Sequence, residues 1–386
     1  MEPRPGSAVN KKVFPMSLPF VDLRAQQARI RTRIDAAISR VLDQGNYILG
    51  AEVGQLEGEL SASCGSRHTL ACANGTDALS LALMALNVRA GDAVFVPSFT
   101  FAATAEVVPL LGATPVFVDV LPDTFNMDVE SLKRSIAHAR ELGLNPKCVV
   151  PVDLFGLPAD FDPILSTARE SGMAVVDDAA QAFGARYKDR IVGSIADIST
   201  TSFYPAKPLG CYGDGGAVFT NDDGLAELID SYRIHGKGPH KYDNVRIGMN
   251  SRLDTLQAAI LLEKLAIFPD ELVERRKVAG RYSSALADRY QTPFVPEGLE
   301  STWAQYTIKT KSHAERSELQ NRAKVQGIPT VIYYPIPLHA QTAFRSFPRD
   351  PKGLPVSEDL ADRVVSLPMH PYLGMQVQDR IIEAIL

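Results

Sequence analysis

Hydrophobic residues near the start of the chain recur three or four positions apart, which predicts an amphipathic helix from Asp22 to Leu42. Its apolar face would carry Ile30, Ile34, Ala37, Ile38 and Val41. A second helix is expected over Ala51–Ser63. Residues 1–18, which precede both helices, are polar and contain several prolines, and we expect a loose arm there.

From residue 69 onward, short apolar runs alternate with helical patterns. The runs that predict strands are Thr69–Ala73, Ala93–Val96, Pro115–Val120, Cys148–Val152, Ala174–Val176, Ile198–Phe203 and Ala217–Thr220. Helices are expected between them, over a stretch that ends at Leu86 and over Ala102–Leu111, Val129–Leu142, Pro163–Ser171 and Gly224–Arg233. This alternation is typical of an α/β fold whose mostly parallel sheet is covered on both faces. Ligands of such sheets gather at the carboxyl ends of the strands.

The pattern changes after the last of these helices. Residues 236–250 form a loop longer than connections usually are, which indicates a role in an active site or an interface. Asp254–Ala287 is predicted to be helical, with a domain boundary within it near Pro269. A small α/β module follows, with a strand around Tyr306–Thr310, a helix over Ser312–Gln326 and a segment from Gly327 to His339.

At 386 residues the chain is long enough for two domains. We expect an arm and first helix over residues 1–35, a large domain over residues 36–268 and a smaller C-terminal domain over residues 269–386. A hydrophobic content of 45% and a charged content of 22% are typical of a soluble globular enzyme. The formal charge of -5, without a basic block, argues against a nucleic-acid-binding face.

The longest apolar runs, such as Leu81–Leu86, are too short to span a bilayer, and the first residues lack the continuous apolar stretch of a signal peptide. We therefore expect a cytoplasmic protein. The cysteines form no C-x-x-C pair and no histidine cluster has metal-ligand spacing, so neither a metal site nor a disulfide framework is predicted. The four cysteines are Cys64, Cys72, Cys148 and Cys211.

One lysine stands in an unusual setting. The β-prone run that begins at Thr200 breaks into a loop rich in proline and glycine that carries Lys207 between Ala206 and Pro208. Most lysines keep their ammonium group in water, and Lys207 could be one of these. The alternative is a desolvated amine whose lowered pKa suits imine chemistry.

Three other stretches at predicted strand ends add candidate chemistry. The turn Asn74-Gly-Thr-Asp77 opens a helix, and helix N-termini bind anions, although the same residues commonly act as plain N-caps. Asp177 and Asp178 close a buried strand; because strand side chains alternate, only one of them can enter a given site, and the other can be a cap. Gln181 follows one helical turn later, and Pro97–Phe101 supplies the aromatic pair Phe99 and Phe101.

These elements together describe a pyridoxal phosphate site. The cofactor needs an amine for its imine, an anion cradle for its phosphate, an aromatic face for its ring and a carboxylate that keeps its ring nitrogen protonated. Each element is common alone, whereas their combination in one chain is specific.

At these motifs the chain resembles the DegT/DnrJ/EryC1/StrS family of sugar-nucleotide aminotransferases, a branch of the fold-type I pyridoxal phosphate enzymes. The resemblance covers nearly the whole chain. Its motifs are Pro19-Phe-Val-Asp-Leu-Arg-Ala-Gln, Asn74-Gly-Thr-Asp-Ala-Leu, Asp177-Asp-Ala-Ala-Gln, Phe203-Tyr-Pro-Ala-Lys-Pro-Leu-Gly, Gly213-Asp-Gly-Gly-Ala, Asn250-Ser-Arg-Leu-Asp-Thr-Leu-Gln-Ala-Ala, Tyr334-Pro-Ile-Pro-Leu-His and Ser366-Leu-Pro-Met.

The resemblance implies a role for each matching residue. Lys207 would form the imine and shuttle protons, Asp178 would pair with the ring nitrogen, and Gln181 would hydrogen-bond the ring hydroxyl. Phe101 is our candidate for the stacking aromatic, with Phe99 as the alternative. The large domain would bind the cofactor, and its phosphate ligands would be Gly75, Thr76, Ser202 and, from the partner subunit of a homodimer, Asn250.

The resemblance also implies a substrate. Arg252, Tyr333, Tyr334 and His339 match motifs that line the sugar pocket, while Arg233 and His235 match a recurrent motif that can equally serve interface packing. Glutamate would be the amino donor. The loop around Lys207 looks most like the members that aminate C3 of UDP-linked 2-acetamido-3-keto-hexuronic acids for O-antigens and other lipopolysaccharide or surface polysaccharide products. Arg252 would suit the uronate carboxylate, although it can also be a general sugar contact; Tyr333 stands where many members carry histidine.

Three alternatives remain open from the sequence. One is a C3 or C4 aminotransferase of the same family that acts on a 6-deoxy-keto-sugar carried by dTDP, UDP or GDP. Another is a dehydratase of the same fold, in which histidine replaces the lysine; the presence of Lys207 argues against it. The last is a catalytically silent regulatory protein that kept the fold.

Overall fold

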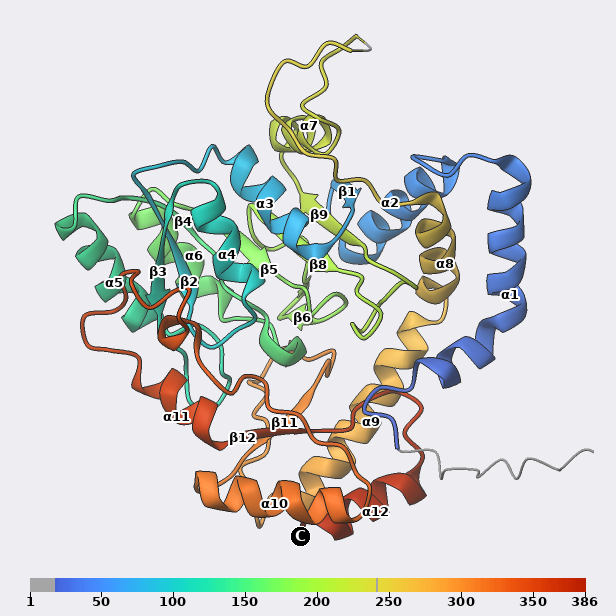
Figure 1. The fold of residues 1–386 in the computed structure, drawn as a ribbon, viewed down its shortest axis with the longest axis vertical. Helices are drawn as coiled ribbons and strands as arrows, with labels where there is room; N and C mark the ends of the chain where they lie inside the picture. The colour runs from blue at the N-terminus through green and yellow to red at the C-terminus, as the bar shows by residue number, and fades with distance from the viewer. Residues whose placement is uncertain (1–17, 241) are drawn as a thin grey trace, which may run out of the picture.

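The fold is described by a computed structural model that covers residues 18–240 and 242–386. Nearly all of the arm expected over residues 1–18 lies outside the described residues. A seven-stranded sheet forms the centre of the molecule (Figure 1). In spatial order its strands are β1 (His68–Cys72), β9 (Gly216–Thr220), β8 (Ile198–Ser202), β5 (Ala174–Asp178), β4 (Asn145–Val149), β2 (Asp92–Pro97) and β3 (Thr114–Val118).

Only β9 runs against its neighbours in this sheet. It pairs antiparallel with β1 and with β8, whereas the contacts from β8 through β3 are all parallel. The prediction of a mostly parallel sheet in an α/β fold is therefore confirmed, and the carboxyl ends of β5 and β8 meet at the same edge.

Two hydrophobic cores cover the two faces of the sheet. Alternate residues of one strand point to opposite faces, so Val94 and Val96 of β2 lie in one core while Ala93 and Phe95 lie in the other. The first core is built with α3 (Gly75–Ala85), α4 (Ala103–Leu110) and α7 (Asp223–Tyr232). The second is built with α5 (Val129–Glu141) and α6 (Phe161–Glu170).

The first predicted helix is α1 (Leu23–Gln44), and the side chain of Asp22 caps it by accepting a hydrogen bond from the amide of Ala25. Its expected apolar face is buried at Ile30, Ile34, Ala37 and Val41, while Ile38 is half-buried. This face packs on α8 (Thr255–Leu265), which also contacts α2 (Ala51–Cys64).

The long helical region expected after Asp254 is two helices. The first, α8, ends at Leu265, and α9 (Phe268–Leu286) begins three residues later with Pro269 in its first turn. Proline, which has no amide hydrogen, fits there because the amides of the first helical turn have no hydrogen-bond partner within the helix. The residue near which the boundary was predicted thus lies at the start of α9, and the boundary itself stays a prediction.

A separate hydrophobic core lies beyond α9. There β11 (Tyr306–Lys309) pairs antiparallel with β12 (Val364–Leu367), and side chains from α9, α10 (His313–Val325) and α12 (Met375–Ile385) surround this pair. Figure 1 shows these elements grouped below the central sheet, with α11 (Pro355–Arg363) between the two regions. The segment expected to complete this module returns to the large sheet: Leu338, in the short 3-10 helix η2 (Leu338–Ala340), packs in the first core.

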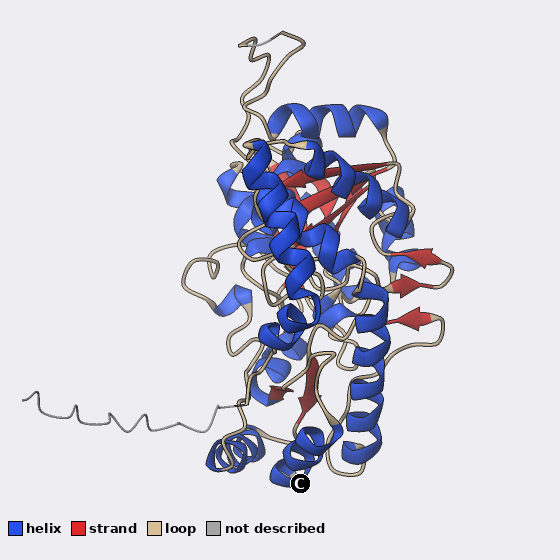
Figure 2. Ribbon diagram, turned by 90° about the vertical axis from the view of Figure 1, so that its right-hand side faces the viewer, coloured by secondary structure: helices blue, strands red, loops and turns tan. Residues whose placement is uncertain are grey.

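Several short elements lie outside these cores. Strands β6 (Arg186–Tyr187), β7 (Arg190–Ile191) and β10 (Leu299–Glu300) form a small antiparallel sheet at one side of the molecule (Figure 2). The 3-10 helix η1 (Leu154–Gly156) follows β4. The described parts of the predicted loop, residues 236–240 and 242–250, project beyond α7 (Figure 1). Lys237 forms a bridge with Asn244 within the loop, and Ile234, just before it, forms a bridge with Asn250.

The first described residues reach the C-terminal region. Phe20 accepts a hydrogen bond from the amide of Met369 at 3.2 Å through its carbonyl, and its ring centroid lies 6.2 Å from that of Tyr333. All four cysteines are free and buried. Within the described ranges, there is neither a group of metal-ligating side chains nor a helix with the length and apolar character of a membrane span.

Candidate active site

Lys207 lies in a tight loop that leaves the end of β8. The backbone amide of Lys207 donates to the carbonyl of Tyr204 at 2.9 Å, and the amide of Cys211 donates to the carbonyl of Phe203 at 2.8 Å. Burial lowers the pKa of the Lys207 ammonium, and the carboxylate of Asp178 opposes this shift. Lys207 is half-buried, so the structure is compatible with a partly desolvated amine, and its imine role stays a prediction.

A buried lysine on α8, Lys264, contacts the same loop at Gly210. The ammonium of Lys264, on α8, donates to the carbonyl of Gly210 and lies 4.2 Å from the centroid of the Tyr212 ring. Its side chain is fully buried, and burial lowers its pKa to about 8. Gly210 is needed here, because a Cβ atom at this position would come within 2.6 Å of the carbonyl oxygen of Pro205. Lys264 therefore fixes the loop that carries Lys207.

Asp178 ends β5 and faces Lys207. Its Oδ2 accepts a 2.7 Å hydrogen bond from the hydroxyl of Thr104 at the start of α4, and its Oδ1 accepts from the amide of Ala180 at 3.3 Å. Burial raises the pKa of Asp178, whereas the bond from Thr104 and the charge of Lys207 act in the opposite direction. A carboxylate with these partners suits a cationic ring nitrogen.

Gln181 is held on three sides. Its Oε1 accepts a hydrogen bond from the amide of Phe155, its Nε2 donates to the hydroxyl of Tyr334 at 3.4 Å, and its backbone carbonyl accepts from the hydroxyl of Thr302 at 2.8 Å. Because the amide oxygen is occupied by Phe155, the amide nitrogen is the end that faces Tyr334. Gln181 thus presents a donor, as recognition of a ring hydroxyl oxygen requires.

The structure separates the two candidate stacking aromatics. Phe99 is almost fully buried and packs edge-on against Tyr334, with ring centroids 6.1 Å apart. Phe101 is 58% exposed, and its centroid lies 6.4 Å from that of Tyr334. An exposed ring beside the site can receive a planar ligand, whereas a core ring cannot, so the geometry favours Phe101.

The predicted phosphate cradle is assembled from two strand ends. At the start of α3 the side chain of Asn74 accepts from the amide of Asp77 at 2.8 Å, so Asn74 is an N-cap. The other amides of this first turn have no partner within the helix. A Cβ atom at Gly75 would lie 2.7 Å from Cβ of Ser202 at the end of β8, so these two backbones can approach only because Gly75 has no side chain. Thr76 follows in the same turn.

Asn250 and Arg252 flank Ser251, whose hydroxyl accepts a 3.2 Å hydrogen bond from the amide of Ala73, next to the cradle residue Asn74. They line a depression that Lys207 and Asp178 do not line; its other lining residues are Ile48, Ala73, Gly213, Asp214, Asp254 and Gln257. Sequence reasoning placed Asn250 in the site of a partner subunit. Its position here leaves that role as a prediction, and Arg252 shares the same location.

The predicted sugar-pocket residues near Tyr334 differ in their surroundings. Tyr334 contacts Gln181, and burial raises its pKa. Tyr333 is partly buried against Phe20. His339 is buried, with Nδ1 2.7 Å from the hydroxyl of Ser98 and Nε2 3.1 Å from Glu358. Since both ring nitrogens of His339 have protein partners, the contacts support a role in holding the loop after β2 rather than direct contact with a sugar.

The recurrent motif residues after α7 have internal partners. The guanidinium of Arg233 is buried and forms ion pairs with Glu57 and Asp230, and it also donates to the carbonyl of Ala71 at 2.6 Å. The amide of His235 donates to the carbonyl of Met249 at 2.8 Å. Arg233 therefore joins α2, β1 and α7 within one chain, which is a packing role.

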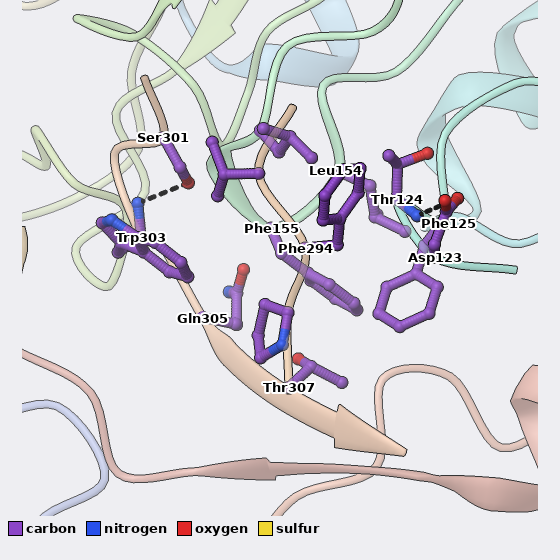
Figure 3. Close-up of a pocket in the computed structure, with 13 residues that line it drawn as sticks. Asp123, Thr124, Phe125, Leu154, Phe155, Phe294, Ser301, Trp303, Gln305 and Thr307 are labelled. Carbon is purple, nitrogen blue, oxygen red and sulfur yellow. Dashed lines mark hydrogen bonds between the residues drawn. The ribbon is translucent and has the colours of Figure 1, made fainter. Parts of the chain in front are cut away.

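A hollow at the junction of the two regions lies behind Gln181. Figure 3 shows it lined by Leu154, Phe155, Phe294 and Trp303, with Gln305 among them. Neither Lys207 nor Asp178 lines it. The hollow is mainly apolar and is therefore not part of the cofactor site.

Comparisons with known proteins agree with this arrangement. Residues 28–386 match the DegT/DnrJ/EryC1/StrS aminotransferase family. The chain is 48% identical over 355 residues to a Pseudomonas aeruginosa protein named UDP-2-acetamido-2-deoxy-3-oxo-D-glucuronate aminotransferase, with 92% of this chain and 95% of that protein covered. The chain belongs to the DegT/DnrJ/EryC1/StrS aminotransferase family.

Solved structures support the same assignment. A DegT/DnrJ/EryC1/StrS aminotransferase from Brucella abortus matches with a TM-score of 0.94 and 54% identity, over 95% of this chain and 98% of that one. NtdA from Bacillus subtilis, solved with bound cofactor PMP, matches with a TM-score of 0.86 and 28% identity, over 97% and 86% of the two chains. The predicted family, fold, enzyme class and pyridoxal phosphate cofactor are thereby confirmed.

The residues of this DegT/DnrJ/EryC1/StrS aminotransferase fit that cofactor. Gly75 and Ser202 bring the N-terminus of α3 beside the end of β8, where a phosphate would be held, and the charge of Asp178 acts on the ammonium of Lys207. Sequence reasoning missed Thr104 and Thr302, which hold Asp178 and Gln181. Thr104 lies three residues after Phe101, and its place at the start of a helix beside a strand end was the only available signal.

Proposed function

We propose that this aminotransferase transfers the amino group of glutamate to C3 of a UDP-linked 2-acetamido-3-keto-hexuronic acid. Transamination rests on one observation above all: the half-buried Lys207 lies in the tight loop that follows β8, and the buried carboxylate of Asp178 ends the neighbouring strand β5. The substrate rests on the 48% identity to the Pseudomonas aeruginosa enzyme whose name specifies such a sugar. The product would serve the synthesis of O-antigen or another surface polysaccharide, in the cytoplasm.

The chain would hold the cofactor through residues from separate strands. Gly75, Thr76 and Ser202 would bind the phosphate, and Phe101 would cover one face of the ring. Asp178 would keep the ring nitrogen protonated, because a buried carboxylate with a cation as partner remains ionised. Gln181 would donate a hydrogen bond to the ring hydroxyl oxygen.

When bound, pyridoxal phosphate supplies an aldehyde that accepts the amino group and a ring that withdraws electrons from the reacting carbon. Lys207 would remove the proton from Cα of glutamate, and it would deliver a proton to C3 of the sugar in the reverse direction. An amine acts as a base only when neutral, and burial, which lowers the pKa of Lys207, favours that form.

A homodimer would complete each site. Asn250, which lines a depression together with Ala73 and Gly213, would serve the phosphate of a partner subunit. Arg252 lines the same depression, so it would enter the partner's site together with Asn250 and could bind the uronate carboxylate with two parallel hydrogen bonds. Tyr333, Tyr334 and His339 would belong to the opposite wall, with His339 acting through Ser98.

An amination assay tests the substrate proposal. The purified protein would be supplied with glutamate and a panel of keto-sugar nucleotides that differ in the nucleotide, the keto position and the presence of a C6 carboxylate. We expect turnover with the UDP-linked 3-keto-uronate and weaker turnover with its 6-deoxy counterpart. Activity on 6-deoxy sugars alone would establish the alternative class of substrate, and no turnover on any member would favour a regulatory protein.

A further inference from the structure

Two buried aspartates lie behind the cofactor side of the sheet. Asp177 precedes Asp178 in β5, and its side chain points to the opposite face because strand residues alternate. Asp153 follows β4 and pairs with the same strand end: its amide donates to the carbonyl of Asp178 at 3.1 Å, and the amide of Asp178 donates to the carbonyl of Pro151 at 3.0 Å. The side chains of Asp153 and Asp177 are fully buried and face each other.

The hydrogen-bond partners of these carboxyl groups leave three oxygens unaccounted for. Oδ1 of Asp153 accepts from the amide of Ala159 at 2.7 Å. Oδ2 of Asp153 and both oxygens of Asp177 are buried and accept no hydrogen bond from an N–H or hydroxyl donor in the part of the chain that the structure describes. Ser199 lies beside Asp177 without forming a well-aligned bond, and no ion pair of the described residues includes either carboxyl group.

Two ionised carboxylates in contact, without a cation, are unfavourable in a protein interior. A carboxyl group that keeps its proton can donate it to the neighbouring carboxylate, and this satisfies the otherwise unpaired oxygens. Burial, which raises the pKa of both groups, acts in the same direction.

We propose that Asp153 and Asp177 share one proton and that this carboxyl pair fixes η1 as the support that positions Gln181. Asp153 begins η1, because its carbonyl accepts from the amide of Gly156 at 3.2 Å. Two residues after Asp153, the amide of Phe155 donates a hydrogen bond to Oε1 of Gln181. This inference depends on the proposed function in one respect: it takes Gln181 to be a contact of the cofactor.

The conformation of η1 explains why a support is needed. Phe155 has a φ of 59°, in the left-handed region that non-glycine residues rarely adopt. Its ring packs against Phe125, with centroids 6.0 Å apart, at the edge of the hollow in Figure 3. If Asp153 were released, Phe155 could relax to an ordinary conformation, and its amide would no longer hold the Gln181 side chain in one orientation. Asp153 and Asp177 are positioning residues, since neither faces the cofactor side.

Infrared difference spectroscopy on the full-length protein with its cofactor tests the shared proton. At neutral pH we expect a carbonyl band of a buried protonated carboxylic acid that disappears in Asp177→Asn and in Asp153→Asn. Asp119→Asn is the matched control, because this buried aspartate accepts hydrogen bonds from the amide and hydroxyl of Ser357 and is not part of the carboxyl pair. The band should persist in the control. Absence of the band from the wild type, or its persistence in both test variants, would overturn the proposal.

Hydrogen exchange of the peptide that covers residues 153–159 tests the support of η1. In Asp177→Asn the amide can still donate to Asp153, so the exchange rate should remain close to that of the wild type. In Asp177→Leu, which has no donor, we expect exchange about tenfold faster; Asp177→Ala is the second variant if the leucine does not fit. An unchanged rate in both apolar variants would contradict the supporting role. Neither measurement depends on which sugar is the substrate, so failure of the proposed function leaves both readouts valid.

Discussion

The hydroxyl of Thr104 donates a 2.7 Å hydrogen bond to Oδ2 of Asp178, and this bond connects the start of α4 to the carboxylate at the end of β5. Because Asp178 is buried, each hydrogen-bond donor to its carboxylate helps to keep this group ionised. Hydrogen bonds to charged groups typically contribute about 1.5–3 kcal/mol.

Thr104→Val should therefore lower kcat by roughly tenfold to hundredfold, since about 1.4 kcal/mol corresponds to a factor of ten. Loss of this donor removes one of the influences that lower the pKa of Asp178, so the acidic limb of the pH–rate profile should move to higher pH. Thr104→Ser keeps the hydroxyl and is the control. A valine variant with the wild-type rate and pH profile would show that this bond is not used.

Lys207→Ala should lose transamination by a factor of at least about a hundred, because general acid–base catalysis by one positioned group contributes on the order of 10² to 10⁴. The covalent cofactor adduct that borohydride traps in the wild type should map to Lys207 in peptide analysis. Lys264 is an internal control, since its amine is also buried with a lowered pKa but is engaged by Gly210. Labelling of Lys264, or full turnover in the alanine variant, would remove the central role of Lys207.

Gly75→Ala should weaken cofactor binding about tenfold or more. The added methyl group would lie 2.7 Å from Cβ of Ser202, and overpacking of this kind costs about 1–3 kcal/mol. Gly58→Ala is a matched control because no atom lies within 4 Å of its added Cβ, so this helical site should be unaffected or slightly stabilised. Cofactor titration by absorbance measures both, and equal affinities for the two variants would contradict the cradle.

Mixed subunits test the origin of Asn250. If Asn250 serves the partner's site, a dimer of one Lys207→Ala subunit and one Asn250→Ala subunit contains one intact site. Random mixing would then restore roughly a quarter of wild-type activity, because about half of the dimers are mixed and each has one working site. Both parent variants must be nearly inactive for this assay. Mixtures that stay as inactive as the parents would place Asn250 in its own subunit's site.

His370 should make stability depend on acidity. Its ring is buried, its nitrogens have no hydrogen-bond partner in the described structure, and burial lowers its pKa to about 4. The folded state thus binds this proton less readily than the unfolded state, so the contribution is fully present above about pH 6.5 and is lost as the pH falls toward 4. The loss approaches about 3 kcal/mol over this window. Chemical denaturation of His370→Gln should show a flatter dependence between pH 4 and 6.5; an unchanged slope would contradict this assignment.

The strands and helices could be predicted because hydrophobic residues alternate along a strand and recur every three or four positions along a helix. Strand β2 places Val94 and Phe95 in opposite cores, and α1 buries Ile30 and Ile34 on one face, so each pattern has one consistent solution. The two-residue strands β6, β7 and β10 are too short to show a period, and they were missed. The segment after Gly327 was assigned to the small module, but Leu338 packs with the large sheet, and no local pattern distinguishes these two cores.

The site residues also differ in how far the sequence alone indicates them. Lys207 and Asp178 were proposed from their places after predicted strands, where topology gathers ligands, and their roles stay predictions. Thr104, Asp153 and Thr302 act through contacts between segments that are distant in sequence, so nothing beside them in the chain identifies their roles. His339 was expected at the sugar, and its bonds to Ser98 and Glu358 depend on tertiary packing that sequence spacing does not determine.

The contact of Phe20 with Tyr333 and Met369 sets an order for biosynthesis. During translation Phe20 emerges from the ribosome early, whereas its two partners, Tyr333 and Met369, emerge only near the end. The strands of the central sheet lie between His68 and Thr220, so all of them emerge before either partner of Phe20. The contact between Phe20 and Met369 therefore forms only after nearly all of the chain has been made.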